Sequence, residues 1–300
     1  MVLKNVLDWL TAEGYCYSFV GDENYDLIGF SSLSNSTSGK LVWIKNKSNY
    51  DKLPSERIVS CAVVQAGLEL AVPNQIITDN SKEVYFSILR HFWGTTRKEG
   101  FVGQGTVIAD GAIIDPTAYI GYNCSIIGPV YIGAHTIIEN NVVISGRVTI
   151  GDYCHIQSEA VIGIDGFSYT KNQDTGAKTM VEHFGGVKIG NNVFIASHVN
   201  IARGTLDDTV ISDGVKIAPS THIGHNNIIG ENATIICANL FGSVKTGKDA
   251  YIVASTVQNQ MEVGEHTVIG MGSVVTRLIP SNVVAFGCPA VIVKENTTDL

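Results

Sequence analysis

The 300-residue sequence has no apolar run long enough to cross a bilayer, so we expect no membrane insertion. Its first residues have no small-residue cleavage site of a signal peptide, which favours a cytoplasmic protein. Charged residues make up only 16% of the chain, and its net charge of −8 comes without any cluster of Lys or Arg. Because neutralising phosphates requires a basic stripe, we expect binding neither to nucleic acid nor to an anionic membrane surface.

Metal-like or disulfide-like cysteine spacing is also lacking. His222 and His225 are close together, but no carboxylate or cysteine recurs at a spacing that would complete a tetrahedral site, so no metal is expected. Residues 1–98 contain no glycine-rich loop with a nearby basic residue, which argues against a sugar nucleotidyltransferase. We expect reduced, mostly structural thiols at Cys16, Cys61, Cys124, Cys154, Cys237 and Cys288.

A six-residue repeat is the dominant pattern that is present. Isoleucine or valine occupies every sixth position from Val102 to Ile162. An amphipathic helix would repeat near 3.6 residues and a half-buried strand near two, whereas three hexapeptides close one triangular coil. The sequence therefore predicts a mainly β protein, built around a parallel β-helix whose apolar corners stack into a core.

The repeat is interrupted and then resumes at Ile189, continuing with short breaks to Val275. Residues 163–188 are rich in polar and turn-forming types that cannot line an apolar interior. We expect them to leave the β-helix as an extruded loop, and loops of this length usually serve function.

Residues 1–98 lack the six-residue period and alternate strand-like runs with turns, which predicts a separate small α/β domain. Asn80 followed by Glu83 resembles a capping box, and the apolar spacing after it predicts a helix from about Ser81 to Trp93. A short amphipathic helix is expected near the N-terminus, ended by Gly14. The β-helix then forms a second domain over residues 99–300.

His225 stands out among eight histidines because of its position in the coil. It lies two residues after the corner Ile223, and the later step from Ile235 to Leu240 spans only five residues. Gly242 therefore also lies two residues after its corner, one coil further on, and one coil rises by roughly 4.8 Å. An imidazole base beside a side-chain-free amide suits acyl transfer, whereas the competing interpretation is a solvated coil residue.

The other histidines carry weaker signals. His222 directly precedes a corner, and His183, which could orient substrate, stands in the extruded loop before two glycines. The remaining five are expected to be exposed polar residues, namely His91, His135, His155, His198 and His266.

Several segments resemble the UDP-3-O-(3-hydroxyacyl)glucosamine N-acyltransferases, hexapeptide-repeat enzymes of lipid A synthesis. Their order and spacing match well, and a weaker likeness at Leu27-Ile28-Gly29-Phe30-Ser31-Ser32-Leu33 extends the resemblance over most of the chain. The segments are Gly163-Ile164-Asp165-Gly166-Phe167-Ser168-Tyr169, Gly185-Gly186-Val187-Lys188-Ile189-Gly190, Arg203-Gly204-Thr205-Leu206-Asp207-Asp208-Thr209, Gly214-Val215-Lys216-Ile217 and Ile223-Gly224-His225-Asn226.

This resemblance implies a left-handed β-helix and a homotrimer with its active sites between subunits. It implies that His225 is the general base and Gly242 the oxyanion donor. The base of a nucleotide sugar would stack between Trp43 and Tyr50, with Asn46 between them in sequence. The extruded-loop residues expected to border the acyl and sugar sites are Asp165, Gly166, Phe167 and Tyr169.

The sequence departs from the family pattern at three places. Ala218-Pro219-Ser220 replaces an Asp-Asn stretch, Ala202 stands where an aspartate usually precedes Arg203, and Asn259-Gln260 takes the place of a Gly-His pair. The chain stops ten residues after Gly287-Cys288-Pro289-Ala290, without the helices that dock acyl carrier protein in the family. This ending resembles that of hexapeptide transferases that use coenzyme A.

We therefore expect an N-acyltransferase that moves an acyl group from acyl-CoA, as co-substrate and without a bound cofactor, to a nucleotide-linked amino sugar for surface polysaccharide. The alternatives are the lipid A enzyme itself, which uses acyl carrier protein, and a non-catalytic β-helix that binds a nucleotide sugar or acts as a scaffold. Neither the sugar, nor the base as uridine or thymidine, nor the acyl chain follows from the sequence.

Overall fold

The computed structural model describes residues 1–95 and 97–295. The chain divides into two compact units, Met1–Thr96 and Arg97–Leu300, and each is described by itself. Among the described residues, no helix combines the length and the apolar character that a membrane span needs.

The N-terminal unit is built on a five-stranded sheet with the order β1-β5-β4-β3-β2, parallel except for β1. Successive side chains of a strand point to opposite faces of the sheet, so each face carries its own apolar cluster. The helices α1 and α3 pack on one of these two faces. The elements are α1 (Leu3–Ala12), β1 (Ser18–Val20), β2 (Gly29–Phe30), η1 (Leu33–Asn35), β3 (Lys40–Ile44), α2 (Lys47–Asp51), β4 (Cys61–Gln65), β5 (Asn74–Thr78) and α3 (Ser81–Trp93).

The predicted helix at Ser81–Trp93 is confirmed by α3, but its start differs from the predicted capping box. The Asn80 side chain makes no cap hydrogen bond to the backbone and instead donates to the Glu83 carboxylate. The amphipathic helix expected near the N-terminus is also present, as α1 from Leu3 to Ala12.

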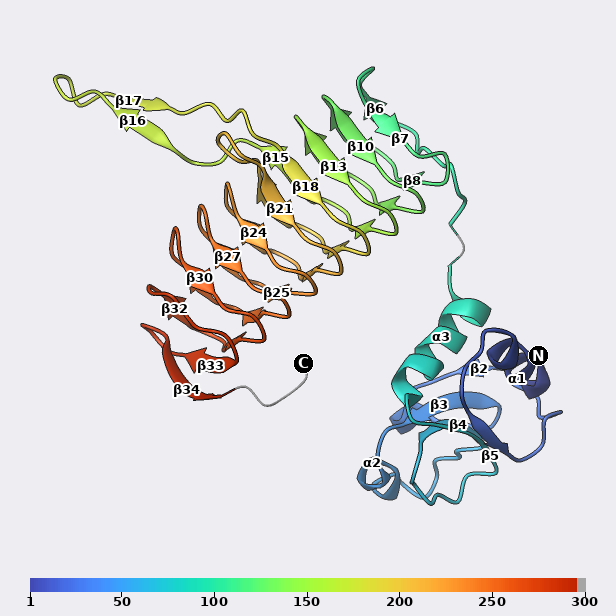
Figure 1. The fold of residues 1–300 in the computed structure, drawn as a ribbon. Coiled ribbons are helices and arrows are strands. Elements are labelled where there is room, and N and C mark those ends of the chain that lie inside the picture. The colour runs from blue at the N-terminus through green and yellow to red at the C-terminus, as the bar shows by residue number, and fades with distance from the viewer. Residues whose placement is uncertain (96, 296–300) are drawn as a thin grey trace. The chain divides into compact units, whose positions relative to one another are not determined.

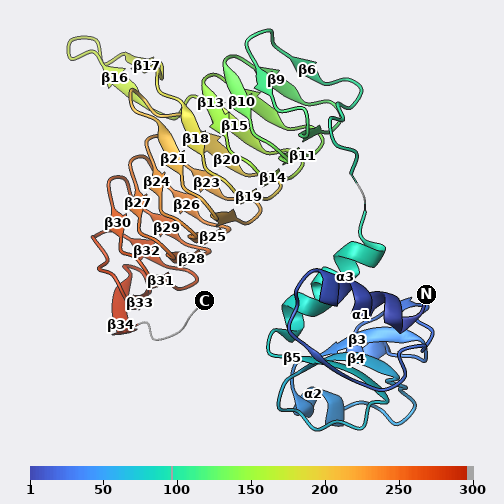
Figure 2. The same cartoon turned by 45° about the vertical axis from the view of Figure 1, so that its right-hand side comes forward.

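Within the described part of the second unit, short strands stack coil upon coil and form the three faces of a prism (Figures 1 and 2). Neighbouring strands within a face are parallel, except for the final pair β33 (Val283–Phe286) and β34 (Val291–Glu295). The eight-stranded face contains β7 (Ile113–Ile114), β10 (Val130–Ile132), β13 (Val148–Ile150), β18 (Val187–Ile189), β21 (Thr209–Ile211), β24 (Ile228–Ile229), β27 (Lys245–Thr246) and β30 (Glu262–Val263). The nine-stranded face contains β6 (Val107–Ile108), β9 (Ser125–Ile127), β12 (Val143–Ser145), β15 (Val161–Ile164), β20 (Asn200–Ala202), β23 (His222–Ile223), β26 (Asn239–Leu240), β29 (Thr256–Val257) and β32 (Val274–Val275).

The ten-stranded face completes the prism and ends in an antiparallel pair, β33 with β34. Its strands are β8 (Tyr119–Ile120), β11 (Ile137–Ile138), β14 (His155–Ile156), β19 (Phe194–Ile195), β22 (Lys216–Ile217), β25 (Thr234–Ile236), β28 (Tyr251–Val253), β31 (Val268–Ile269), β33 (Val283–Phe286) and β34 (Val291–Glu295).

The corner residues predicted from the six-residue period form the core of this prism. Ile138 pairs in register with Ile120 on one side and with Ile156 on the other, and all three side chains are fully buried. Val102, the first residue of the run, is half exposed because it lies at the end of the stack. The predicted mainly β, parallel β-helical architecture is therefore confirmed.

The polar segment between β15 and β18 projects from the prism (Figure 1). It contains a two-stranded antiparallel hairpin of β16 (Tyr169–Lys171) and β17 (Lys178–Met180), whose residues are all exposed. At the base of this loop, the Asp208 carboxylate accepts the Gly186 amide at 2.8 Å and pairs with Arg147 and Lys188. Partial burial raises the pKa of Asp208, but hydrogen bonds from Lys188 and Gly186 and the charge of Arg147 outweigh it and lower the pKa.

Candidate functional site

His225 and Gly242 lie one above the other on neighbouring coils. His225 follows β23, and Gly242 follows β26, whose Leu240 pairs in register with Ile223. A methyl group added to Gly242 would lie 2.5 Å from His225 Nε2. The coil register therefore places these two residues together as the sequence predicts, because the coil between them is shortened by one residue.

The neighbouring Asn226 sets the tautomer of His225. Asn226 Nδ2 donates to the Asp207 carbonyl at 3.0 Å, so its Oδ1 faces the ring and lies 2.9 Å from His225 Nδ1. An amide oxygen can only accept, so Nδ1 carries the proton and Nε2 presents a free lone pair. Asn226 has φ of 59°, a left-handed turn position that asparagine tolerates. Nε2, the atom next to Gly242, is thus the basic nitrogen.

The Gly242 amide supplies a donor beside this base. Its carbonyl accepts from Gln260 N at 3.0 Å and the following amide, Ser243 N, donates to the His225 carbonyl, but Gly242 N–H has no acceptor within the described ranges 1–95 and 97–295. Gly242 is buried. A free amide next to a basic nitrogen can hold the oxyanion that forms when a carbonyl is attacked.

The extruded loop packs against the other side of His225. The point where a Gly166 side chain would begin lies 2.9 Å from His225 Cβ and 3.0 Å from His183 Nε2. Asp165, beside it, accepts from Arg203 Nε at 2.6 Å and from the His183 amide at 3.3 Å. The ion pair with Arg203 and the hydrogen bond from the His183 amide hold Asp165, and with it the start of the loop, next to His225.

Other predicted site residues lie farther out. Phe167 is 79% exposed and Tyr169 is 42% exposed, with Lys178 Nζ 4.5 Å from the Tyr169 ring centre. His222, on the outer surface of the nine-stranded face, places Nδ1 3.0 Å from Asn200 Oδ1, and burial lowers its pKa. Within the described ranges, the hydrogen-bond and ring contacts of the His225 ring are with His183, Thr205 and Asn226 and include none of these three side chains.

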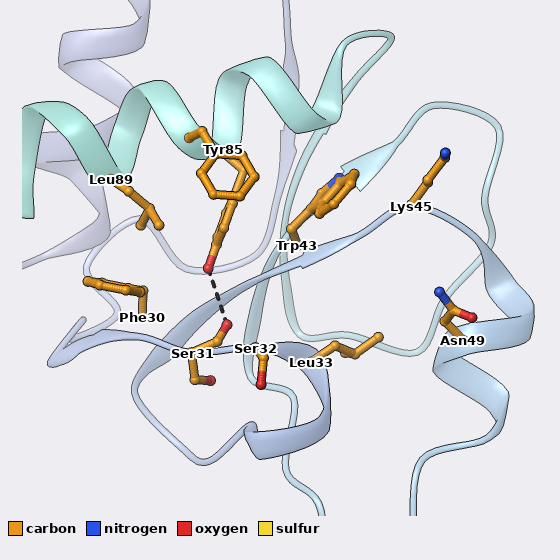
Figure 3. Close-up of a pocket in the computed structure, with 10 residues that line it drawn as sticks. Phe30, Ser31, Ser32, Leu33, Trp43, Lys45, Asn49, Tyr85 and Leu89 are labelled. Atoms are coloured by element: carbon orange, nitrogen blue, oxygen red, sulfur yellow. Dashed lines mark hydrogen bonds between the residues drawn. The ribbon is translucent and has the colours of Figure 1, made fainter. Parts of the chain in front are cut away.

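A pocket of about 480 Å³ opens in the N-terminal unit (Figure 3). Trp43 lines it, donating from Nε1 to Ser81 Oγ at 2.9 Å and packing edge-on against Phe86. The complete lining is Phe30, Ser31, Ser32, Leu33, Trp43, Lys45, Asn49, Tyr85, Phe86 and Leu89.

Asn46 and Tyr50 do not line this pocket. Asn46 caps α2, accepting from Asn49 N at 2.9 Å, and Tyr50 donates to the Ala71 carbonyl at 3.2 Å. Trp43 packs on the cluster of Leu41, whereas Tyr50 packs on the cluster at the opposite face of the sheet. The two rings therefore do not form a preassembled sandwich for a base.

The described residues hold no group of three or more His, Cys, Asp or Glu side chains that could bind a metal ion. The sequence pattern indicated no role for Asn226 or for its partner Thr205, whose hydroxyl donates to Asn226 Oδ1 at 2.9 Å. One sequence feature could have pointed to Asn226: it directly follows His225, at a turn position where residues with positive φ recur from coil to coil.

The chain is similar to known hexapeptide-repeat transferases. A family model described as bacterial transferase hexapeptide (six repeats) matches residues 129–163. The UDP-3-O-acylglucosamine N-acyltransferase of Coxiella burnetii is 30% identical over 255 residues, covering 74% of this chain and 70% of its own length. The protein of the same name from Delftia acidovorans is 29% identical over 293 residues, or 96% of this chain and 86% of that one.

Among solved structures, the UDP-N-acetylglucosamine acyltransferase of Francisella novicida superimposes with a TM-score of 0.58 at 27% identity, over 64% of this chain and 69% of that one. This likeness agrees with the predicted left-handed sense of the β-helix. The relatives are named as acyltransferases and match 74% and 96% of this chain, which argues against a non-catalytic scaffold. The chain belongs to the UDP-3-O-acylglucosamine N-acyltransferase family and is an acyltransferase.

Proposed function

We propose that the protein acylates the amine of a UDP-linked, 3-O-acylated glucosamine, as the names of its relatives state for them. The single observation that carries this proposal is that the unpaired Nε2 of His225 lies next to Gly242, whose amide is also unpaired in the described chain. The nitrogen of a neutral amine becomes positively charged as it attacks a carbonyl unless a base takes one of its protons, and the Nε2 lone pair can accept that proton.

The reaction then follows from these two groups. The amine nitrogen attacks the thioester carbon while its proton moves to His225 Nε2, and the carbonyl oxygen becomes an oxyanion held by Gly242 N–H. When the intermediate collapses, the C–S bond breaks and the imidazolium returns its proton to the departing thiolate. The products are an amide and a free thiol, and His225 regains its starting tautomer.

For the acyl donor, we propose acyl carrier protein rather than the acyl-CoA that the sequence favoured. The preference for coenzyme A rested on the end of the chain and on its resemblance to other transferases, whereas the Delftia acidovorans relative matches 96% of the chain. The function proposed above is the family's own, and the resemblance to the lipid A enzymes implies acyl carrier protein as the donor for that function. No Lys or Arg cluster supports the carrier independently.

The test supplies UDP-3-O-acylglucosamine with equal concentrations of a 3-hydroxyacyl group on acyl carrier protein or on coenzyme A. We expect N-acylated product from both donors and a higher kcat/KM with the carrier protein. A higher kcat/KM with acyl-CoA would reverse the donor assignment, and absence of amide product with either would refute the proposed function.

The nucleotide base is proposed to bind in the pocket that Trp43 lines. We expect Trp43→Ala to raise KM for the nucleotide sugar much more than KM for the acyl donor, because a stacking surface is lost. Trp9 is another partly buried tryptophan of the same core cluster, but it does not line the pocket. Trp9→Ala therefore controls for the loss of packing. Equal changes in both KM values would show that Trp43 only packs.

We also propose that the protein is a homotrimer with shared sites. Five large, exposed apolar side chains lie within two positions of a residue that contacts or lies against His225, namely Gly166, His183, Thr205 or Gly242. Exposed apolar patches often mark interfaces. Sedimentation equilibrium should give about three times the 32.2 kDa chain mass. A fully active monomer would contradict it. The exposed side chains are Ile164, Phe167, Phe184, Leu206 and Phe241.

A further inference from the structure

His183 is a buried imidazole that the mechanism above does not use. It lies in the extruded loop between β17 and β18, and its side chain is only 1% exposed. Nδ1 is 3.0 Å from the carbonyl oxygen of Val181, which can only accept, so Nδ1 carries the proton. Nε2 is then a lone-pair acceptor, and it has no hydrogen-bond partner in the part of the chain that is described.

This unpartnered acceptor lies beside the catalytic base. The His183 and His225 rings are 5.3 Å apart between centres, at an interplanar angle of 79°. His183 Nε2 and His225 Cδ2 each lie 3.0 Å from the point where a Gly166 side chain would begin, so their separation is at most twice that distance. Because position 166 is a glycine, the space next to both rings holds no side chain.

Buried acceptors in native proteins almost always have a donor, and one left without costs stability. The environment of His183 therefore points to a donor that arrives with the substrate. Nε2 is covered by the backbone at Gly166, so the substrate reaches it when the residues after Asp165 move, while the ion pair of Asp165 with Arg203 still holds the start of the loop. Phe167, next along that segment, is 79% exposed and offers the segment little packing in return.

We infer that His183 Nε2 accepts the second N–H of the acceptor amine and so selects an amine over a hydroxyl. This inference rests on the proposed function. A primary amine has two N–H groups, one for His225 and one for His183, whereas a hydroxyl has a single O–H and leaves one acceptor unpaired. The amide product keeps one N–H, so His183 holds this hydrogen throughout while His225 takes the other.

The experiment measures binding without any acyl donor, so that turnover does not interfere. Isothermal titration compares UDP-3-O-acylglucosamine with UDP-3-O-acylglucose, which carries a hydroxyl in place of the amine, at a pH where the amine is uncharged. The proteins are the wild type, His183→Leu, which removes the acceptor, and His183→Gln, which restores one through its amide oxygen. Glu182→Gln, at an exposed neighbouring position, is the matched control.

We expect the wild type to bind the amine about tenfold more tightly than the hydroxyl analogue, the usual size of one hydrogen bond's discrimination. His183→Leu should reduce this ratio to about one, and His183→Gln and Glu182→Gln should keep most of it. Circular dichroism checks the fold of each variant.

Three results would overturn the inference: no preference in the wild type, an unchanged ratio in His183→Leu, or a His183→Gln variant as impaired as His183→Leu. Failure of the wild type to bind either nucleotide sugar would instead refute the proposed function. The two failures are therefore distinguishable.

Discussion

We expect His225→Ala to lower kcat by roughly 10²–10⁴-fold, the usual contribution of a general base. Asn226 Oδ1 holds the proton on Nδ1, which leaves Nε2 as the lone pair beside Gly242. Alanine removes this lone pair and supplies no other base. The ring is half-buried at a turn and is not part of the apolar core, so the fold should persist.

The matched control is His198→Asn. His198 is an exposed histidine of the same prism at φ of 58°, paired with Glu159, and asparagine tolerates that backbone conformation. Its replacement should leave kcat unchanged. Near-normal turnover in His225→Ala, with the fold confirmed by circular dichroism, would show that His225 is a solvated coil residue.

The placement of His225 next to Gly242 could be predicted from the sequence because a β-helix turns local spacing into long-range contact. Each corner stacks on the residue one coil earlier, so Ile223 meets Leu240 although they are 17 positions apart in the chain. The five-residue step before Leu240 corresponds to a tight turn in which Cys237 has φ of 48°. Counting corners was therefore sufficient to bring Gly242 to His225.

Side-chain direction could not be predicted in the same way. Trp43 shares a face of its strand with Leu41 by simple alternation, but Tyr50 lies in α2, beyond the strand, where that period no longer applies. Likewise, His183 Nε2 is unpaired because the loop conformation turns Nδ1 toward the Val181 carbonyl and leaves Nε2 without a donor in the described chain. No repeat constrains that path, so the sequence suggested a role for His183 without its geometry.

The second large effect is expected at the glycine opposite the base. Gly242→Ala keeps the amide N–H but places a methyl 2.5 Å from His225 Nε2, closer than a side-chain carbon normally approaches. The ring cannot swing away from the methyl without losing the hydrogen bond between Nδ1 and Asn226 Oδ1. The methyl would also fill the space between base and amide, where the amine and the acyl carbonyl must meet.

We therefore expect Gly242→Ala to lower kcat/KM by roughly 10²-fold or more, comparable to loss of an oxyanion donor. Gly111→Ala is the matched control, because there an added methyl meets its nearest neighbour, the Gly128 carbonyl oxygen, at an ordinary 3.6 Å. Steady-state kinetics on both variants decides the question. If Gly242→Ala retained near-normal kcat/KM with His225 still essential, the acyl carbonyl would have to bind away from Gly242, and the oxyanion assignment would be wrong.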